Sequence, residues 1–117
     1  MKYLLTIYAD EARFGTMTPA DSGAMMKAYG EFGSAAQDAG VLLGGEGLQP
    51  TATATTVRVR DGETLFTDGP FAETREQLGG YYLIEAANLD EATKIAARIP
   101  SARFGSIEVR PIMVLNP

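Results

Sequence analysis

The sequence contains neither cysteine nor histidine. Without cysteine, the chain can form no disulfide, no thiolate nucleophile and no cysteine-bound zinc or iron–sulfur centre. Without histidine, it lacks the commonest general base and the commonest ligand of transition metals. Any chemistry that the chain's own side chains perform must therefore use carboxylates, Arg, Lys, Tyr, Ser or Thr.

Positive charge and long apolar runs are also scarce. Ten Lys and Arg residues stand against fifteen Asp and Glu residues, so the net charge is −5. An acidic chain is a poor partner for nucleic acid or an anionic membrane, because both attract basic patches. No apolar run reaches the ~18 residues of a membrane-spanning helix, and the apolar start of the chain is too short for a signal peptide. We therefore expect a cytoplasmic protein with no nucleic-acid or membrane partner.

The 117 residues, of which 45% are hydrophobic, are enough for one packed core. No linker or low-complexity stretch divides them, so we expect a single domain over residues 1–117. Alternating β-forming residues predict strands, and apolar residues three and four apart predict helices. The expected strands are residues 3–8, 41–43, 55–60, 63–67, 81–86 and 106–114, and the expected helices are residues 18–39 and 88–99.

Both expected helices begin at capping residues. Thr18 precedes Pro19 and is followed three residues later by Asp21, while Asn88 is followed three residues later by Glu91. The side-chain oxygens of such residues accept hydrogen bonds from the free N–H groups of the first turn. These patterns predict where the two helices start.

Glycine is concentrated in two places. Gly23, Gly30 and Gly33 lie inside the first helix, where each weakens the helix by up to ~1 kcal/mol relative to Ala. They indicate either close packing against the sheet or an imperfect helix. Residues 44–47 surround Glu46 with three more glycines, and the expected explanation is a bulge or bend in a strand.

The dipeptide Asp61-Gly62 lies between two alternating segments and predicts a two-residue β-hairpin turn. This turn pairs Arg60 with Glu63. It also places Val57 opposite Phe66, on a face of the hairpin that is largely apolar.

The element order is strand, helix, strand, hairpin, strand, helix, strand. It predicts an α+β fold, most simply a ferredoxin-like α/β sandwich with an inserted β-hairpin. The helices would cover one face of the sheet. The other face would carry Tyr82, Ile84 and either Leu5 or Leu4, a surface too apolar for water. We therefore predict a homodimer packed sheet to sheet, with a cavity between the sheets.

Residues 68–80 form the longest expected connection, and connections of this length are usually functional or disordered. Asp68, beside the bend at Gly69-Pro70, is the candidate catalytic residue, because a partly buried carboxyl in this position can act as a general acid or base. The alternative is structural, with the Asp68 carboxylate accepting backbone N–H groups in the turn.

Three further residues are candidates for ligand binding. Arg75 offers a planar, two-pronged donor for a ligand carboxylate, and Glu73 lies two residues before it. The alternative for this pair is a solvated salt bridge. Tyr82 can orient a polar ligand, or it can fill the dimer interface as a buried tyrosine.

Acidic residues at four positions could in principle supply oxygen ligands to Mg²⁺ or Ca²⁺: Asp10, Glu11, Glu46 and Asp68. They match no known ligand spacing. We therefore expect no metal site and no cofactor.

Residues 68–82, which begin Asp68-Gly69-Pro70-Phe71, resemble the "DGPF" signature of the YCII-related proteins. The opening, residues 1–8, and the segments 97–100 and 105–112 also match the family, so the resemblance spans essentially the whole chain. It implies a dimeric α+β barrel.

The resemblance implies less about function. YCII-related proteins carry a proposed His–Asp pair in the cleft between the two sheets, and only the aspartate has a counterpart here, Asp68. DGPF proteins are also often encoded beside extracytoplasmic-function sigma factors. Two hypotheses result: a small dimeric protein that binds a small molecule in the inter-sheet cleft, or a non-catalytic dimeric regulatory or interaction protein linked to sigma-factor or stress regulation. Whether the protein is an enzyme is left open.

Overall fold

The structure is a computed structural model and describes residues 1–115. Two short 3-10 helices, η1 (Thr51–Thr53) and η2 (Pro100–Arg103), accompany the longer elements. Those elements are β1 (Lys2–Ala9), α1 (Glu11–Phe14), α2 (Pro19–Asp38), β2 (Leu42–Gly47), β3 (Thr55–Arg60), β4 (Glu63–Asp68), β5 (Gln77–Glu85), α3 (Leu89–Ala97) and β6 (Ser106–Pro111).

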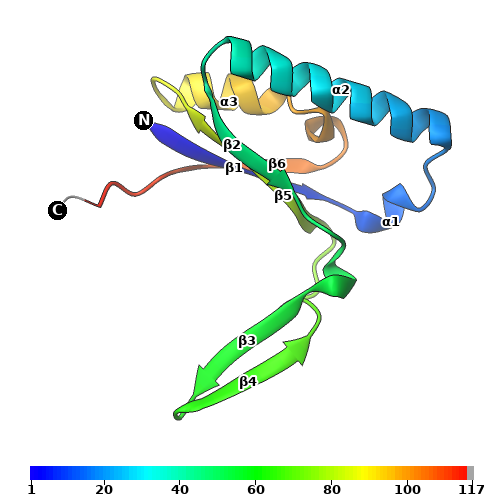
Figure 1. The fold of residues 1–117 in the computed structure, drawn as a ribbon, viewed down its shortest axis with the longest axis vertical. Coiled ribbons are helices and arrows are strands. Elements are labelled where there is room, and N and C mark those ends of the chain that lie inside the picture. Colours follow the sequence, from blue (N-terminus) through cyan, green and yellow to red (C-terminus); the bar gives the residue numbers. More distant parts are fainter. Residues whose placement is uncertain (116–117) are drawn as a thin grey trace.

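Four strands form an antiparallel sheet in the order β2-β5-β1-β6 (Figure 1). β1 runs through the middle, so that Leu5 stands opposite Tyr82 of β5 and Val109 of β6. β1 and β2, which α2 connects, have β5 between them. β5 and β6, which α3 connects, have β1 between them. The α+β class is confirmed. Pro111 ends the edge strand β6, as expected for a residue without an N–H group.

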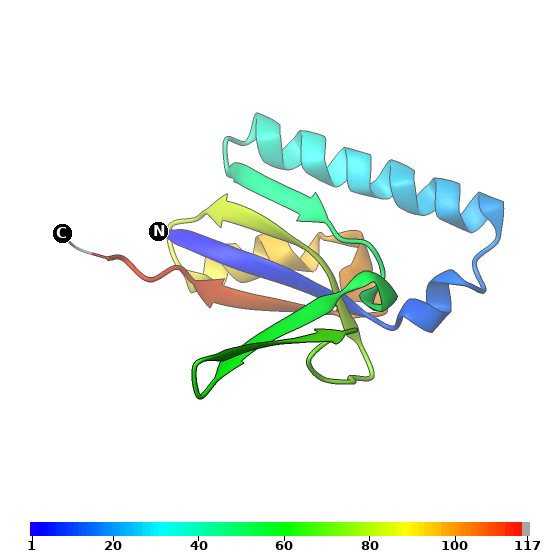
Figure 2. The ribbon, with the colours of Figure 1, turned by 60° about the horizontal axis from the view of Figure 1, so that its bottom comes forward.

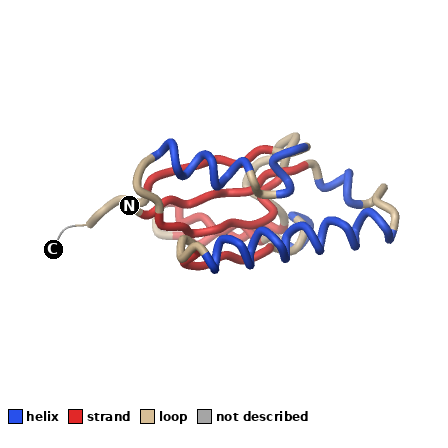
Figure 3. Tube along the Cα trace, turned by 90° about the horizontal axis from the view of Figure 1, so that it is seen from above, coloured by secondary structure: helices blue, strands red, loops and turns tan. Residues whose placement is uncertain are grey.

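The helices α2 and α3 cover one face of this sheet, and Figure 3 shows the strands running beneath them. The largest fully buried side chains are those of Leu5, Ile84 and Ile99. The other core residues are Tyr3, Ile7, Phe32, Ala36, Ala86, Ala92, Ile95 and Ala96.

No helix within residues 1–115 is long and apolar enough to cross a membrane.

Both long helices begin at the predicted caps. The Thr18 hydroxyl accepts the Asp21 N–H at 3.1 Å, and the Asp21 carboxylate accepts the Thr18 N–H at 3.3 Å. The side-chain oxygen of Asn88 accepts the Glu91 N–H at 2.9 Å. These bonds satisfy donors of the first turn that have no partner within the helix.

The face of the sheet that the helices leave open differs from the prediction. Leu5 and Ile84 are buried under the helices, and the Tyr82 ring packs against Phe32 of α2 with ring centroids 5.1 Å apart. Both alternating faces of β1 and β5 are rich in apolar residues, so sequence alternation did not distinguish them. Directly paired residues share a face, and the open face therefore carries Leu4, Thr6, Tyr8, Tyr81 and Leu83.

The hairpin β3-β4 stands away from the sheet and the helices (Figures 1 and 2). Asp61 and Gly62 in its turn have φ values of 51° and 79°, as a tight hairpin turn requires. Arg60 pairs with Glu63, which confirms the predicted register. Because the hairpin projects, the radius of gyration is 16.4 Å, whereas a compact chain of this length has a value of about 13 Å.

β2 and β5 extend furthest beyond their expected bounds. β2 continues through the glycine-rich segment to Gly47. Its register shifts between Leu42 and Gly44, just before the predicted bulge or bend, and residues 44–47 pair regularly with β5. β5 begins at Gln77, so the end of the predicted loop belongs to the sheet. A Cβ at Gly80 would lie 2.8 Å from the Glu46 carbonyl oxygen, so glycine lets β2 and β5 approach closely.

Candidate functional site

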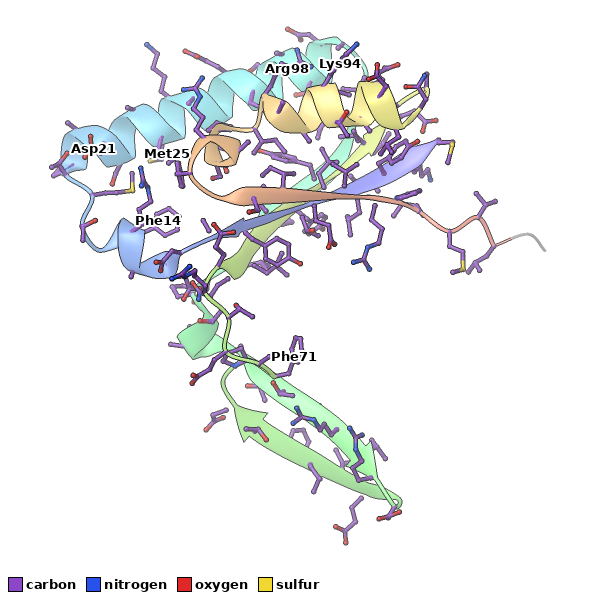
Figure 4. The ribbon with its side chains drawn as sticks, turned by 180° about the vertical axis from the view of Figure 1, so that it is seen from behind. Phe14, Asp21, Met25, Phe71, Lys94 and Arg98 are labelled. Carbon is purple, nitrogen blue, oxygen red and sulfur yellow. The ribbon has the colours of Figure 1, made fainter. Side chains whose placement is uncertain are left out.

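A cavity of about 420 Å³ lies against the helix-covered face of the sheet, toward α1. Phe14 of α1 and Met25 of α2, labelled in Figure 4 at the same end of the molecule, form part of its apolar wall. The cavity lies within one chain. The cleft predicted between two sheets requires a second copy and stays a prediction. The lining residues are Ile7, Ala9, Glu11, Phe14, Met25, Tyr29, Gly45, Glu46, Gly47, Gln77, Gly79, Gly80, Tyr81, Tyr82 and Ser101.

Two glycines of β2 shape the floor of this cavity. A Cβ at Gly45 would lie 2.6 Å from the Tyr82 ring, so glycine at this position allows the ring to lie across β2. Gly47 shares this face of the strand by alternation, and a Cβ there would meet no atom within 4 Å. The absence of a side chain at Gly47 therefore leaves space open in the cavity.

Four lining residues carry a hydroxyl group. Alternation places the Tyr81 side chain on the open face of the sheet, which leaves the hydroxyls of Tyr29, Tyr82 and Ser101. The Tyr29 hydroxyl is hydrogen-bonded to that of Ser101, whose side chain is buried. The Tyr82 hydroxyl forms no hydrogen bond with any of residues 1–115. Burial of Tyr82, together with the nearby Tyr29, raises the pKa of Tyr82 above its ordinary value. Tyr82 is therefore neutral at physiological pH and has both a donor and an acceptor available.

The two acidic residues of the lining have different surroundings. Both carboxylate oxygens of Glu11 accept hydrogen bonds of 2.8 Å from Thr51, one from its N–H and one from its hydroxyl. The Glu11 N–H donates in turn to the side-chain oxygen of Gln77 at 2.8 Å. These bonds connect α1 to η1 and β5 at one side of the cavity. Glu46 is exposed and pairs with Tyr81 in the sheet.

Of the catalytic and ligand-binding candidates Asp68, Glu73, Arg75 and Tyr82, Tyr82 alone lines the cavity. Glu11 and Glu46, which were considered as metal ligands, also line it. Asp68 ends β4 and lies opposite Thr55 at the base of the hairpin, where it is exposed. Glu73 and Arg75 lie on the exposed loop that follows, as does Phe71, which Figure 4 labels at the base of the hairpin. The single chain therefore does not bring these residues together with Tyr82.

The structural alternatives stated for the loop are not observed either. Within residues 1–115, the Asp68 carboxylate accepts no backbone hydrogen bond, and Glu73 and Arg75 form no ion pair. The turn is held instead by the Gly69 N–H, which donates to the Ala54 carbonyl at 2.7 Å, and by the Thr56 hydroxyl, which donates to the Gly69 carbonyl at 2.9 Å. Gly69 has a φ of 101°, the left-handed conformation that favours glycine.

The described part of the chain contains no group of three acidic residues that could hold a metal ion. Glu11 and Glu46 both line the cavity, whereas Asp68 lies at the base of the hairpin. Asp10 caps α1 through the Ala12 N–H at 3.0 Å, and Glu11 binds Thr51.

With this geometry established, the chain can be compared with known proteins. The model of the YCII-related domain matches residues 1–116. The chain belongs to the YCII-related family. A relative from Rhizobium meliloti (strain 1021), named uncharacterized protein R00369, is 39% identical over 119 aligned residues, which cover 100% of this chain and 96% of the relative. The relative's name states no activity, so the function of this YCII-related protein must be argued from its site.

Sequence reasoning missed several residues of the cavity. Tyr29 lies within the helix expected over residues 18–39 but was not singled out, and no pattern marked Ser101 or Phe14. Their grouping depends on contacts between α1, α2 and η2, which are distant in sequence. The one available signal was the glycine-rich segment around Gly47, because glycines inside a strand often mark the close approach of a ligand or another backbone.

Proposed function

We propose that this YCII-related protein is a small dimeric protein that binds a small molecule. The observation that carries the proposal is the cavity of about 420 Å³. Ligand sites usually have volumes of roughly 300–1,000 Å³ and mostly apolar walls with a few placed polar groups. The cavity has this character, because Ile7, Phe14 and Met25 supply apolar wall and Tyr82 supplies a hydroxyl.

A thermal-shift screen against small lactones, phenols and carboxylates tests the proposal. Wild-type protein should give hits. The substitution Gly47→Val should abolish them, because its side chain would occupy the open space beside Gly47, while a valine suits the strand backbone. Gly33→Ala is the control: Gly33 lies on α2, outside the cavity lining and away from the open sheet face, and a Cβ there would meet nothing within 4 Å. A screen without hits, or hits that survive Gly47→Val, would contradict the proposal.

The homodimer is part of the same proposal. The chain exposes 8276 Å² of surface, whereas a compact monomer of its mass exposes roughly 6,200 Å². A standard interface covers about 800 Å² on each partner, so the excess is sufficient for one. Two open sheet faces packed against each other would form the dimeric α+β barrel and enclose the inter-sheet cleft.

An acid–base role for Asp68 depends on that dimer. Asp68, Glu73 and Arg75 lie on an exposed segment at the base of the hairpin, and this position supports the proposal that a second copy completes a site around them. The substitution Asp68→Asn should then change the hits of the screen or their pH dependence. If all hits are indifferent to Asp68→Asn, Asp68 has no role in binding, while the cavity proposal stands.

A non-catalytic regulatory or interaction protein is the second candidate. The exposed apolar face of the hairpin, with Val57, Val59 and Phe66, favours it, because such patches commonly mark protein interfaces. In this role the protein would act in the cytoplasm in sigma-factor or stress regulation. A dimer that gives no hits in the small-molecule screen would favour this candidate over the first.

A further inference from the structure

The charges around the cavity restrict the kind of ligand that it can hold. Within residues 1–115, no Lys or Arg side chain lines the cavity, and its charged lining residues are Glu11 and Glu46. An ionised carboxylate or phosphate would lose its hydration on entering and gain no cationic partner, which is strongly unfavourable. The Glu11 carboxylate would also repel it.

A cationic ligand is also disfavoured, because an ammonium group would lose its hydration on entering. The Glu11 carboxylate keeps its charge, but both of its oxygens already accept hydrogen bonds from the N–H and hydroxyl of Thr51, with which an ammonium group would have to share it. Glu46 pairs with Tyr81, and alternation places the side chains of that pair on the sheet face opposite to Tyr82. Of the two acidic lining residues, Glu11 alone could then face an ammonium group inside the cavity.

What the interior does offer is hydroxyl groups and apolar wall. The hydroxyls of Tyr29 and Ser101 are hydrogen-bonded to each other. The Tyr82 hydroxyl has no partner within residues 1–115, although the Tyr82 ring is fixed by Phe32 and by the lack of a side chain at Gly45. A ring held in place with a free hydroxyl can select a ligand that offers one matching polar atom.

We infer that the cavity takes an uncharged ligand with an apolar ring system and one hydroxyl or carbonyl group, and that the Tyr82 hydroxyl binds this group. The inference rests on the proposed function, because it specifies the ligand class of the same cavity. Tyr82 acts as a specificity residue, because its hydroxyl favours ligands with a neutral polar group. The absence of Lys and Arg side chains from the lining disfavours carboxylates.

A matched series of naphthalene compounds tests this ligand class. The compounds carry a hydroxymethyl, a carboxylate or an aminomethyl group at the same ring position, so that shape is nearly constant while the charge is neutral, negative or positive at neutral pH. Dissociation constants are measured with the full-length wild-type protein by calorimetry or ligand-observed NMR. The hydroxymethyl compound should bind at least tenfold more tightly than either charged compound.

Two variants assign the effect to the cavity and to Tyr82. Tyr82→Phe should weaken the hydroxymethyl compound by about threefold to tenfold, the effect of one net hydrogen bond, and should leave methylnaphthalene unchanged. Gly47→Val should abolish binding of both compounds.

The possible results separate this inference from the proposed function. If the carboxylate or the amine binds as tightly as the alcohol and Gly47→Val abolishes that binding, the cavity is a ligand site and the inferred ligand class is wrong. Equal effects of Tyr82→Phe on the alcohol and on methylnaphthalene would remove the role of Tyr82. If no compound of the series binds the wild-type protein, the inference fails, and if the broader screen also gives no hits, the proposed function fails with it.

Discussion

Tyr82 owes its position to a neighbouring residue without a side chain. Any Cβ at Gly45 would collide with the Tyr82 ring, at 2.6 Å, and with the Tyr81 carbonyl oxygen, at 2.8 Å. With glycine there, the ring lies across β2 and packs on Phe32. The sequence marked Tyr82 as a candidate for binding but left open whether it faced a ligand or a partner. Long-range contacts with Gly45 and Phe32, which lie on different elements, place the Tyr82 ring on the helix-covered side of the sheet.

The raised pKa of Tyr82 predicts a loss of stability in alkali. The folded protein holds the phenolic proton more tightly than the unfolded chain, because ionisation would place a charge in a partly buried site. Above the ordinary tyrosine pKa of about 10, the unfolded chain binds fewer protons than the native protein, so the free energy of unfolding falls as pH rises. The stabilisation is fully present below that pH and is lost as pH rises through the folded-state pKa.

Denaturant unfolding of wild-type protein and Tyr82→Phe as a function of pH checks this prediction. The stability of Tyr82→Phe should decline less steeply than that of the wild type above about pH 10, and the two curves should run parallel between about pH 6 and 9. Identical slopes in the alkaline range would show that Tyr82 is not the responsible group.

At the scale of elements, α2 is a continuous helix of 20 residues despite its three glycines. The sequence left open whether these glycines allow close packing or make the helix imperfect. Neither explanation holds, because the helix is unbroken and a Cβ at Gly23, Gly30 or Gly33 would meet nothing within 4 Å. The capping box at Thr18 and the burial of Phe32 and Ala36 offset the low helix propensity of glycine.

Replacement of these glycines should stabilise the protein. Gly23→Ala and Gly30→Ala should each raise the free energy of unfolding by up to ~1 kcal/mol, because alanine has the higher helix propensity and there is space for its methyl group. Thermal unfolding measures the change. Gly40→Ala is the control with the opposite sign, because Gly40 has a φ of 73°, which strains alanine. A loss of stability in Gly30→Ala would indicate a contact at this helix face that forms only in an assembly.

For the molecule as a whole, the feature that matters most is the hairpin that stands off the body. The principal extents are 49 × 48 × 18 Å, so the chain is broad and thin. An isolated two-stranded hairpin is only marginally stable in water, and this one exposes Val57, Val59 and Phe66 on one face. The open face of the sheet presents a second apolar surface, with Leu4 and Leu83. A symmetric dimer in which the two open sheet faces pack against each other would cover apolar surface of this kind on both copies.

The substitution Phe66→Lys should therefore weaken the dimer, because Phe66 is 72% exposed in the single chain and a charge at an apolar interface loses its hydration. Sedimentation velocity at micromolar concentration should show a dimer for the wild type and a shift toward monomer for Phe66→Lys. Met26→Lys is a matched control, since Met26 is 76% exposed but lies on α2, away from both apolar surfaces. A monomeric wild-type protein, or equal effects of the two substitutions, would contradict the proposed interface.

The local features of this protein could be predicted from its sequence. The helix caps at Thr18 and Asn88 and the turn at Asp61-Gly62 depend on residues within a few positions of one another. The order of the elements was likewise enough for the α+β class. Short-range sterics and hydrogen bonding decide such features, so the sequence is sufficient for them.

The candidate site was decided by the tertiary structure. Which faces of β1 and β5 lie under the helices depended on packing, because apolar residues occupy both faces of these strands. The cavity forms where α1, α2, η2 and the glycine-rich strand β2 meet β5, and no short segment contains that information. The sequence by itself marked the loop of residues 68–80 as the site, and it identified Tyr82, on the strand expected after that loop, as a candidate for ligand binding. In the folded chain Tyr82 and this loop lie apart, because Tyr82 packs under α2 while the loop follows the projecting hairpin.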